Sequence, residues 1–169
     1  MQDWTIDDDV NSLVEVVNIK VLRDVDVPHI LDFERQKLKS RGLSEPEVEL
    51  NSWESSWRTE SLDFYLGSGW SFAKWQGVEG ESTLLAYFLA QPLLFFRSMT
   101  QTLWIERLGY VQLEHAKDLF DVAFRLSREK HLQKLILKGE NDLIQHLTDW
   151  EFSKIGEQMY EFKTSKIRG

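Results

Sequence analysis

TLWIERLGYVQLEHAKDLFDVAF, residues 102–124, is the stretch that decides the fold of this chain. Its first seven residues are typical of a β-strand. Apolar side chains then recur at helical spacing, at Leu113, Ala116, Phe120, Ala123 and Phe124. The helix is expected to end near His131, and residues 132–137 form the next predicted strand. Because a strand, a helix and a second strand in this order make a right-handed crossover, we expect the two strands to run parallel and to splay apart into a V-shaped cleft.

The remaining segments place this crossover in a larger sheet. They predict a strand at 14–22, helices from Asp26 to Gly42 and from Ser44 to Gly67, strands at 70–75 and 83–90, a helix at 140–150 and a strand at 152–162. Asp26 and Ser44 are good helix caps, and a proline follows each of them in the first turn. The order β-α-α-β-β-β-α-β-α-β indicates an α/β protein with a mixed, mostly antiparallel sheet flanked by helices. We expect one domain over residues 1–169, with residues 1–11 irregular or flexible.

The composition argues against several classes of protein. The chain has no cysteine and a net charge of −8, so disulfides and thiolate metal sites are excluded and a nucleic-acid partner is not expected. The four histidines, His29, His115, His131 and His146, show no metal-ligand spacing, and no metal site is expected. The longest apolar run, residues 84–96, is too short to span a bilayer. The acidic first residues are unlike a signal peptide, which favours a cytoplasmic location.

The two ends of the chain resemble a known family. VLRDVDVPHI (residues 21–30) resembles a first strand leading into a first helix, and LQKLIL (132–137) follows the long helix at the family spacing. DWEFSKIG (149–156) resembles the end of the last helix and the start of the next strand, with Phe152 as an anchoring aromatic. In order and spacing these segments are similar to the GNAT family of acyl-CoA N-acyltransferases, over about residues 14–162. The resemblance implies a GNAT-like fold, acetyl-CoA or another acyl-CoA as co-substrate, and a small-molecule or peptide amine as acceptor.

The resemblance also implies where acyl-CoA would bind. In the family, a loop of pattern Arg/Gln-x-x-Gly-x-Gly/Ala holds the pyrophosphate on backbone N–H groups at a helix N-terminus. The residues that match this loop after Val111 are Gln112, Leu113, Glu114, His115 and Ala116. The strand backbone at Ile105 and Arg107 would hold the pantetheine arm.

Glu114 makes this pyrophosphate-binding loop a degenerate one, because it replaces the central glycine. A carboxylate at ~5 Å from a phosphate costs on the order of 1–3 kcal/mol at an effective dielectric of about 20–60. We therefore expect acetyl-CoA to bind weakly or not at all. In the alternative interpretation, Glu114 is a solvated first-turn acid that stabilises a structural helix.

Glu106 is the candidate general base. The family's reaction is attack of an amine on a thioester, which needs a base and often a tyrosine that protonates the thiolate. Glu106 lies on strand 102–108, with Trp104 and Leu108 expected on the same face, and an apolar setting favours a carboxyl that takes up a proton near neutral pH. Alternatively, Glu106 pairs with an arginine or lysine on the adjacent strand. Five residues before Phe152, where the family has its tyrosine, this chain has Leu147.

Two apolar features have alternative interpretations. Trp53 and Trp57 lie one helical turn apart, and we expect one in the core and the other in a substrate cleft. The regular strand at 83–90 is expected to end or bulge at Pro92. The run LLFFR (93–97) then either continues beyond the bulge and is buried, which we favour, or forms an exposed patch for a partner.

Two functions of different class follow. The first is a GNAT-like N-acyltransferase that moves an acyl group, expected to be acetyl, from acyl-CoA to an amine of unknown identity. The second is a catalytically inactive GNAT-like domain that binds a protein or small molecule in the former cleft. A membrane partner is not expected, and a homodimer is left open.

Overall fold

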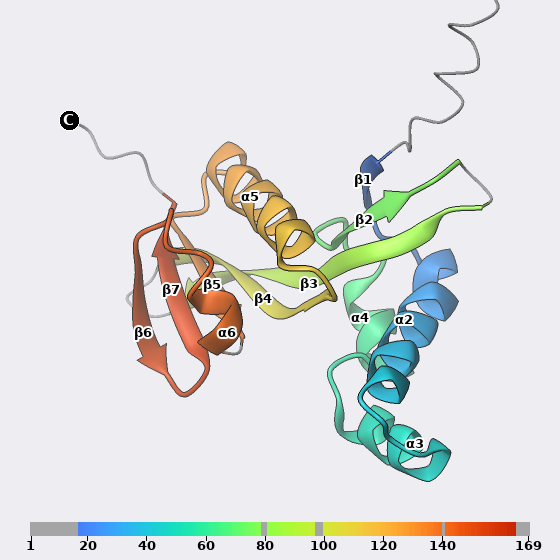
Figure 1. Cartoon of the computed structure of the whole chain (residues 1–169). Coiled ribbons are helices and arrows are strands. Elements are labelled where there is room, and N and C mark those ends of the chain that lie inside the picture. The colour runs from blue at the N-terminus through green and yellow to red at the C-terminus, as the bar shows by residue number, and fades with distance from the viewer. Residues whose placement is uncertain (1–16, 79–80, 97–99, 140, 165–169) are drawn as a thin grey trace, which may run out of the picture.

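A seven-stranded sheet forms the centre of the molecule (Figure 1). The computed structural model describes residues 17–78, 81–96, 100–139 and 141–164. The strands are β1 Val17–Val21, β2 Phe72–Gln76, β3 Thr83–Phe96, β4 Thr100–Tyr110, β5 Lys134–Lys138, β6 Phe152–Gly156 and β7 Met159–Lys163. Their order in the sheet is β1-β2-β3-β4-β5-β7-β6, and every neighbouring pair is antiparallel except β4 and β5. The predicted fold class and the parallel crossover are therefore confirmed.

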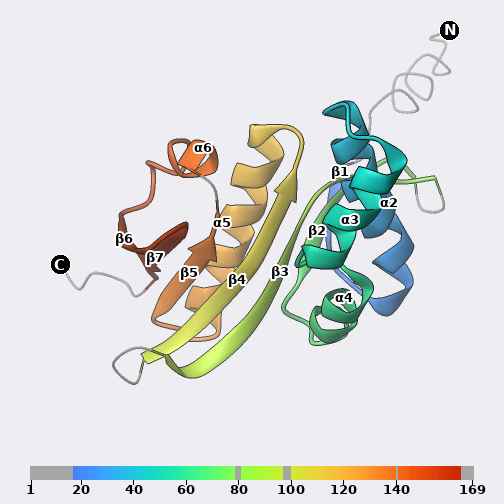
Figure 2. The ribbon, with the colours of Figure 1, turned by 90° about the horizontal axis from the view of Figure 1, so that it is seen from below.

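Helices cover both faces of the sheet (Figure 2). One face carries α2 (Val27–Ser40), α3 (Glu45–Glu54) and α4 (Thr59–Tyr65), with a 3-10 turn, η1 (Asp24–Asp26), before them. The other face carries α5 (Leu113–Glu129) and the short α6 (Asn141–Ile144). Within the described ranges, no helix is long and apolar enough to cross a membrane.

The segment from Ser44 to Gly67 contains two helices where the sequence predicted one. Ser44 and Glu47 begin α3 with a capping box, in which the Ser44 N–H donates to the Glu47 carboxylate at 2.9 Å. Ser55 then leaves the helix with an extended backbone, and its hydroxyl donates to the Ser52 carbonyl at 3.0 Å. A serine side chain that bonds a nearby carbonyl competes with the helix ladder, which explains the break before α4.

Three further boundaries differ from the prediction. The last predicted strand is a hairpin of β6 and β7, and in its turn Gln158, not a glycine, has a positive φ of +57°. Helix α6 is only one turn long, because single turns that end at Leu147 and Trp150 follow it instead of further helix. Strand β3 runs through Pro92, which pairs with Leu103, so the expected strand end there is wrong, and the pairing of β3 with β4 is irregular between Leu89 and Ala90 and between Leu93 and Phe96.

Two apolar cores lie on the two faces of the sheet. The core beneath α5 and α6 includes Phe88, Phe120 and Phe162, and Phe152 packs against it with its ring 5.4 Å from that of Phe162. The core beneath α2 and α4 includes Leu62 and Tyr87.

The two tryptophans of the α3–α4 region differ in exposure. Trp57 is 3% exposed and belongs to the core beneath α2 and α4. Trp53 is 66% exposed and lines a shallow hollow with Leu31 and Arg35, not the larger cleft beside β4. The run 93–97 continues β3 as far as Phe96, but the side chains of residues 94–97 lie outside the described part of the structure.

Candidate active-site cleft

Strands β4 and β5 diverge and leave a cleft between them. They pair from Thr102 and Lys134 as far as Ile105 and Leu137, but β4 continues to Tyr110. Beyond Ile105, no described strand pairs with this edge of β4. The resulting cleft has a volume of about 1170 Å³, and its walls are the ends of β4 and β5, the start of β3 and one side of α2. The predicted V-shaped cleft is present.

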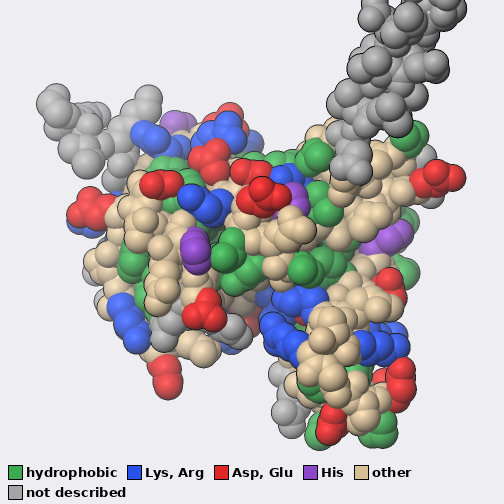
Figure 3. Space-filling view, in the orientation of Figure 1, with side chains coloured by type: hydrophobic (Ala, Val, Ile, Leu, Met, Phe, Trp, Pro, Cys, Tyr) green, Lys and Arg blue, Asp and Glu red, His purple; other side chains and the backbone are tan. Residues whose placement is uncertain are grey.

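Figure 3 shows this region as a hollow in the surface. The hollow separates the part of the molecule formed by β5, β6 and β7 from the part formed by α2 and α3. Lysine and arginine side chains gather along the α2–α3 side of it. The basic residues that line the cleft are Lys37, Arg41, Arg107 and Lys138.

A β-bulge on β4 brings Glu106 and Arg107 to the same face of the sheet. Leu89 pairs with Arg107 and Ala90 with Ile105, so Glu106 is the extra residue of the bulge. Arg107 contacts α2, and Glu106 contacts Trp104 on the same face. Leu108 packs in the core beneath α5, on the other face. The expected grouping of Glu106 with Leu108 is wrong, because a bulge interrupts the alternation of side chains along a strand.

The Glu106 carboxylate lines the cleft and accepts two hydrogen bonds. Trp104 Nε1 donates to one oxygen at 2.8 Å, and Lys138 Nζ on β5 donates to the other at 3.2 Å. The ion pair with the adjacent strand, one of the two interpretations of Glu106, is therefore present. The charge of Glu106 also reaches Tyr65 on α4: burial, and after it this charge, raise the pKa of Tyr65 to about 12.

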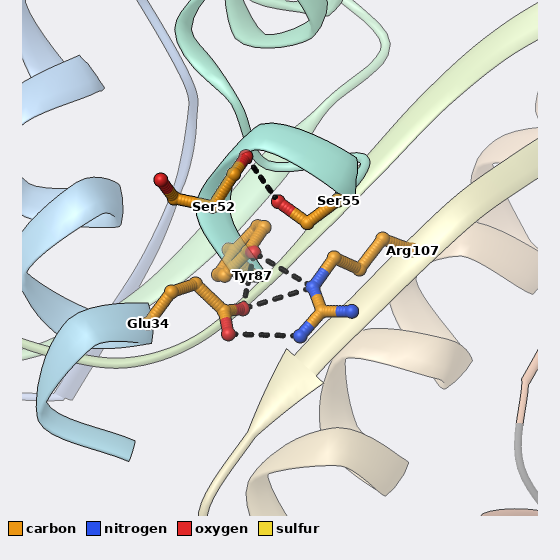
Figure 4. A network of polar contacts seen from close by, with 5 residues as sticks. All are labelled: Glu34, Ser52, Ser55, Tyr87 and Arg107. Atoms are coloured by element: carbon orange, nitrogen blue, oxygen red, sulfur yellow. Dashed lines mark hydrogen bonds and ion pairs between the residues drawn. The ribbon is translucent and has the colours of Figure 1, made fainter. Parts of the chain in front are cut away.

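A buried polar network joins α2, β3 and β4 beside the cleft (Figure 4). Arg107 donates from Nε and Nη2 to the two oxygens of Glu34, at 2.9 and 2.8 Å, and the Tyr87 hydroxyl donates to Glu34 as well. Glu34 is 2% exposed and Tyr87 is fully buried. Burial, and then the Glu34 charge, raise the pKa of Tyr87 well above its usual value. Burial alone would lower the pKa of Arg107, but Tyr87 and Glu34 outweigh it and raise that pKa.

Gly109 leaves the space that this network needs. A Cβ at this position would lie 2.8 Å from Tyr87 Cζ and 2.9 Å from Glu34 Oε1. Position 109 therefore needs a glycine because a side chain would not fit there, and not because the backbone has an unusual conformation. Sequence reasoning missed the network, and the only signal for it was this glycine inside a strand.

The residues predicted to hold pyrophosphate lie at the start of α5 and do not line the cleft. Gln112 is the N-cap, and its carbonyl accepts hydrogen bonds from the N–H groups of His115 and Ala116 at 3.1 and 3.5 Å. The Glu114 side chain is 73% exposed, with its carboxylate 3.6 Å from His115 Nε2. Leu113 and Ala116 pack on the core beneath α5.

His115 and the strand residues complete the predicted set. His115 Nδ1 lies 2.8 Å from Nζ of Lys74 on β2, a side chain that also donates to Asp118 at 2.5 Å. Through these contacts Lys74 on β2 holds the first turn of α5 against the sheet, and the His115 ring is part of that attachment. Ile105 is 1% exposed and pairs with Leu137, whereas Arg107 does line the cleft.

Solved structures show which fold this is, although no family model and no curated protein sequence matches the chain. The PaiA N-acetyltransferase of Thermoplasma acidophilum, in complex with coenzyme A, is 15% identical, with a TM-score of 0.58 over 88% of this chain and 99% of that one. A GNAT family acetyltransferase from Brucella melitensis, in complex with acetyl-CoA, is 12% identical, with a TM-score of 0.55 over 89% and 90%. Another from Listeria monocytogenes is 10% identical, with a TM-score of 0.57 over 86% and 92%. The chain has the fold of the GNAT acetyltransferases.

Proposed function

We propose that the protein is an N-acyltransferase of the GNAT type, which moves an acyl group, acetyl in the first instance, from acyl-CoA to an amine. The observation that carries the proposal is the cleft at the divergence of β4 and β5, with Glu106 on its wall. Two similar structures are complexes with coenzyme A or acetyl-CoA, which supports acyl-CoA as the co-substrate.

The open edge of β4 supplies the contacts for the pantetheine arm. Beyond Ile105 its backbone faces the cleft without a partner strand among the described residues. An extended chain with amide groups can bind such an edge as an added strand does, through main-chain hydrogen bonds. These contacts do not depend on side-chain identity, so they survive the loss of the glycine at Glu114.

Glu106 is the base in the proposed reaction. The amine nitrogen attacks the thioester carbonyl, its proton passes to the Glu106 carboxylate, and the C–S bond breaks with the electron pair going to the thiolate of CoA. Trp104 and Lys138 hold the carboxylate in place through the hydrogen bonds at 2.8 and 3.2 Å.

An inactive domain that binds a partner in the same cleft is the second candidate. Glu114 in place of the loop glycine, and Leu147 in place of the family's tyrosine, favour it.

Calorimetric titration with acetyl-CoA, followed by an assay for thiol release with a panel of amines and peptides, separates the two candidates. Saturable binding with amine-dependent release of CoA is the expected result. Binding without release on any acceptor would favour the inactive domain. Absence of binding at millimolar acetyl-CoA would contradict the acyltransferase.

A further inference from the structure

We propose that Lys37 on α2 and Arg41, the C-cap residue of that helix, bind the phosphate groups of coenzyme A. The inference rests on the proposed function, because it takes acyl-CoA as the ligand. It assigns the charge-binding part of the site to a different helix from the one that the sequence pattern indicated.

The last turns of α2 form the wall of the cleft next to the end of β4. Gln36, Lys37, Ser40 and Arg41 line the cleft together with Tyr110 and Val111. Lys37 Nζ lies 5.5 Å from the centre of the Tyr110 ring, and Tyr110 is the last residue of β4. The cationic side of α2 is thus next to the strand end that leads into α5.

Two of the four basic residues that line the cleft form ion pairs with acidic side chains. Arg107 pairs with Glu34 at 2.8 Å and Lys138 with Glu106 at 3.2 Å. By contrast, Arg41 forms no ion pair with an acidic side chain in the described part of the chain. Asp32 and Asp142 also line the cleft, but Lys37 and Arg41 lie together near the end of β4, where a positive charge attracts an anion.

The start of α5 offers little positive charge for the same phosphates. Lys117 pairs with Asp149 at 3.4 Å, Lys74 pairs with Asp118 at 2.5 Å, and Glu114 adds a negative charge. The side-chain charge that attracts a phosphate to this end of the cleft therefore comes mainly from Lys37 and Arg41.

The spacing of the two cations favours a diphosphate over a single carboxylate. Lys37 and Arg41 are four residues apart, so their Cβ atoms are about 6 Å apart on the same side of the helix. Two long cationic side chains that start this close together can each reach one phosphate of a diphosphate, whereas a lone carboxylate offers a single charge for both.

Substitution of these two residues tests the inference, with binding of CoA and of pantetheine, which lacks the phosphates, measured by calorimetry. Lys37→Gln and Arg41→Gln are each expected to weaken CoA binding about tenfold, and the double variant more, since each removes a charge-assisted hydrogen bond. Pantetheine binding should stay unchanged, and the loss should shrink at high salt. Lys37→Arg, which keeps the charge, should keep the affinity.

Lys39→Gln is the matched control. It removes the same charge from the same helix, but Lys39 pairs with Glu45 at 2.9 Å and does not line the cleft. Its affinity for CoA should stay within about twofold of the natural chain, because an exposed charge outside the cleft is screened by solvent.

Three results would overturn the inference, each in a different way. If the double variant keeps the CoA affinity of the natural chain, the phosphates lie elsewhere while the acyltransferase proposal stands. If it keeps that affinity but raises KM for anionic acceptors alone, the two cations belong to the acceptor site. If the natural chain binds neither CoA nor pantetheine, the proposed function fails and this inference fails with it.

Discussion

Both carboxylate oxygens of Glu34 accept hydrogen bonds from Arg107, a residue 73 positions later in the chain. Such a two-bond contact between a guanidinium and a carboxylate fixes orientation as well as distance. Here it fixes α2 against β4, so the helix that forms one wall of the cleft is held to the strand that forms another.

Loss of the Glu34 charge should destabilise the fold. Glu34→Gln is expected to lower the free energy of unfolding by about 2–4 kcal/mol, because it leaves the Arg107 charge without its buried partner. Urea denaturation measures the change. Glu45→Gln is the control, since the Glu45 side chain is 79% exposed and solvent screens its pair with Lys39, so its loss should change stability little. Equal losses in the two variants would contradict a structural role for the buried pair.

A methyl group at Gly109 should disturb the same network. Gly109→Ala is expected to cost about 1–3 kcal/mol of stability, because its Cβ would lie too close to Tyr87 and Glu34. Gly139→Ala is the matched control, since a Cβ there meets no atom closer than 3.5 Å. Adding Tyr87→Leu should make the Gly109→Ala cost smaller than it is in the natural chain, and thermal unfolding of the four proteins in this cycle checks it. Fully additive losses would show that the clash lies elsewhere.

Substitution of Glu106 tests whether this residue acts in catalysis or in folding. If it is the base, Glu106→Gln should slow acyl transfer by about 100-fold or more while the melting temperature changes by only a few degrees. Glutamine can still accept the hydrogen bond from Trp104, which limits the structural effect. A large fall in melting temperature would instead assign Glu106 to a structural ion pair with Lys138.

Variants of Glu114 test how much this residue of the degenerate loop lowers the affinity for CoA. Glu114→Gln removes the charge, and Glu114→Gly removes charge and bulk, at about 0.5–1 kcal/mol of helix stability. Because the side chain is 73% exposed, we expect Glu114→Gln to raise CoA affinity only a few-fold, with a gain that shrinks at high salt. A gain seen only with glycine would show that bulk, not charge, is the obstacle. Micromolar binding by the natural chain would show that neither matters greatly.

Tyr65 should make the protein less stable at alkaline pH. Its pKa is raised to about 12 in the folded chain, against about 10 for an unfolded tyrosine. Between pH 10 and 12 the folded state therefore keeps a proton that the unfolded state has lost. The stabilisation that Tyr65 contributes is complete below pH 10 and is lost as the pH rises towards 12. Between pH 9 and 12, the free energy of unfolding measured by urea denaturation should fall more steeply with pH for the natural chain than for Tyr65→Phe. Parallel curves would contradict the perturbed hydroxyl.

The local sequence predicted most of the helices and strands, and it did so where side-chain spacing is regular. The apolar stripe of α5 and the capping box at Ser44 produced helices that begin close to where they were expected. Prediction failed where a single residue changes the course of the chain. The serine pair at Ser52 and Ser55 ends α3, and in the turn between β6 and β7 the residue with a positive φ is Gln158 and not a glycine.

By itself, then, the sequence determined the order of most strands and helices, the parallel crossover and the position of Glu106 on β4, because these depend on periodicity and chain connection. Only the tertiary structure decided which side chains face the cleft. The bulge at Glu106 changes the facing of every later residue on β4, and it depends on how β4 pairs with β3. Glu34, Tyr87 and Arg107 meet because three elements pack together. Lys37 and Arg41 line the cleft for the same reason, since their place depends on where α2 crosses the sheet and not on the residues around them in the chain.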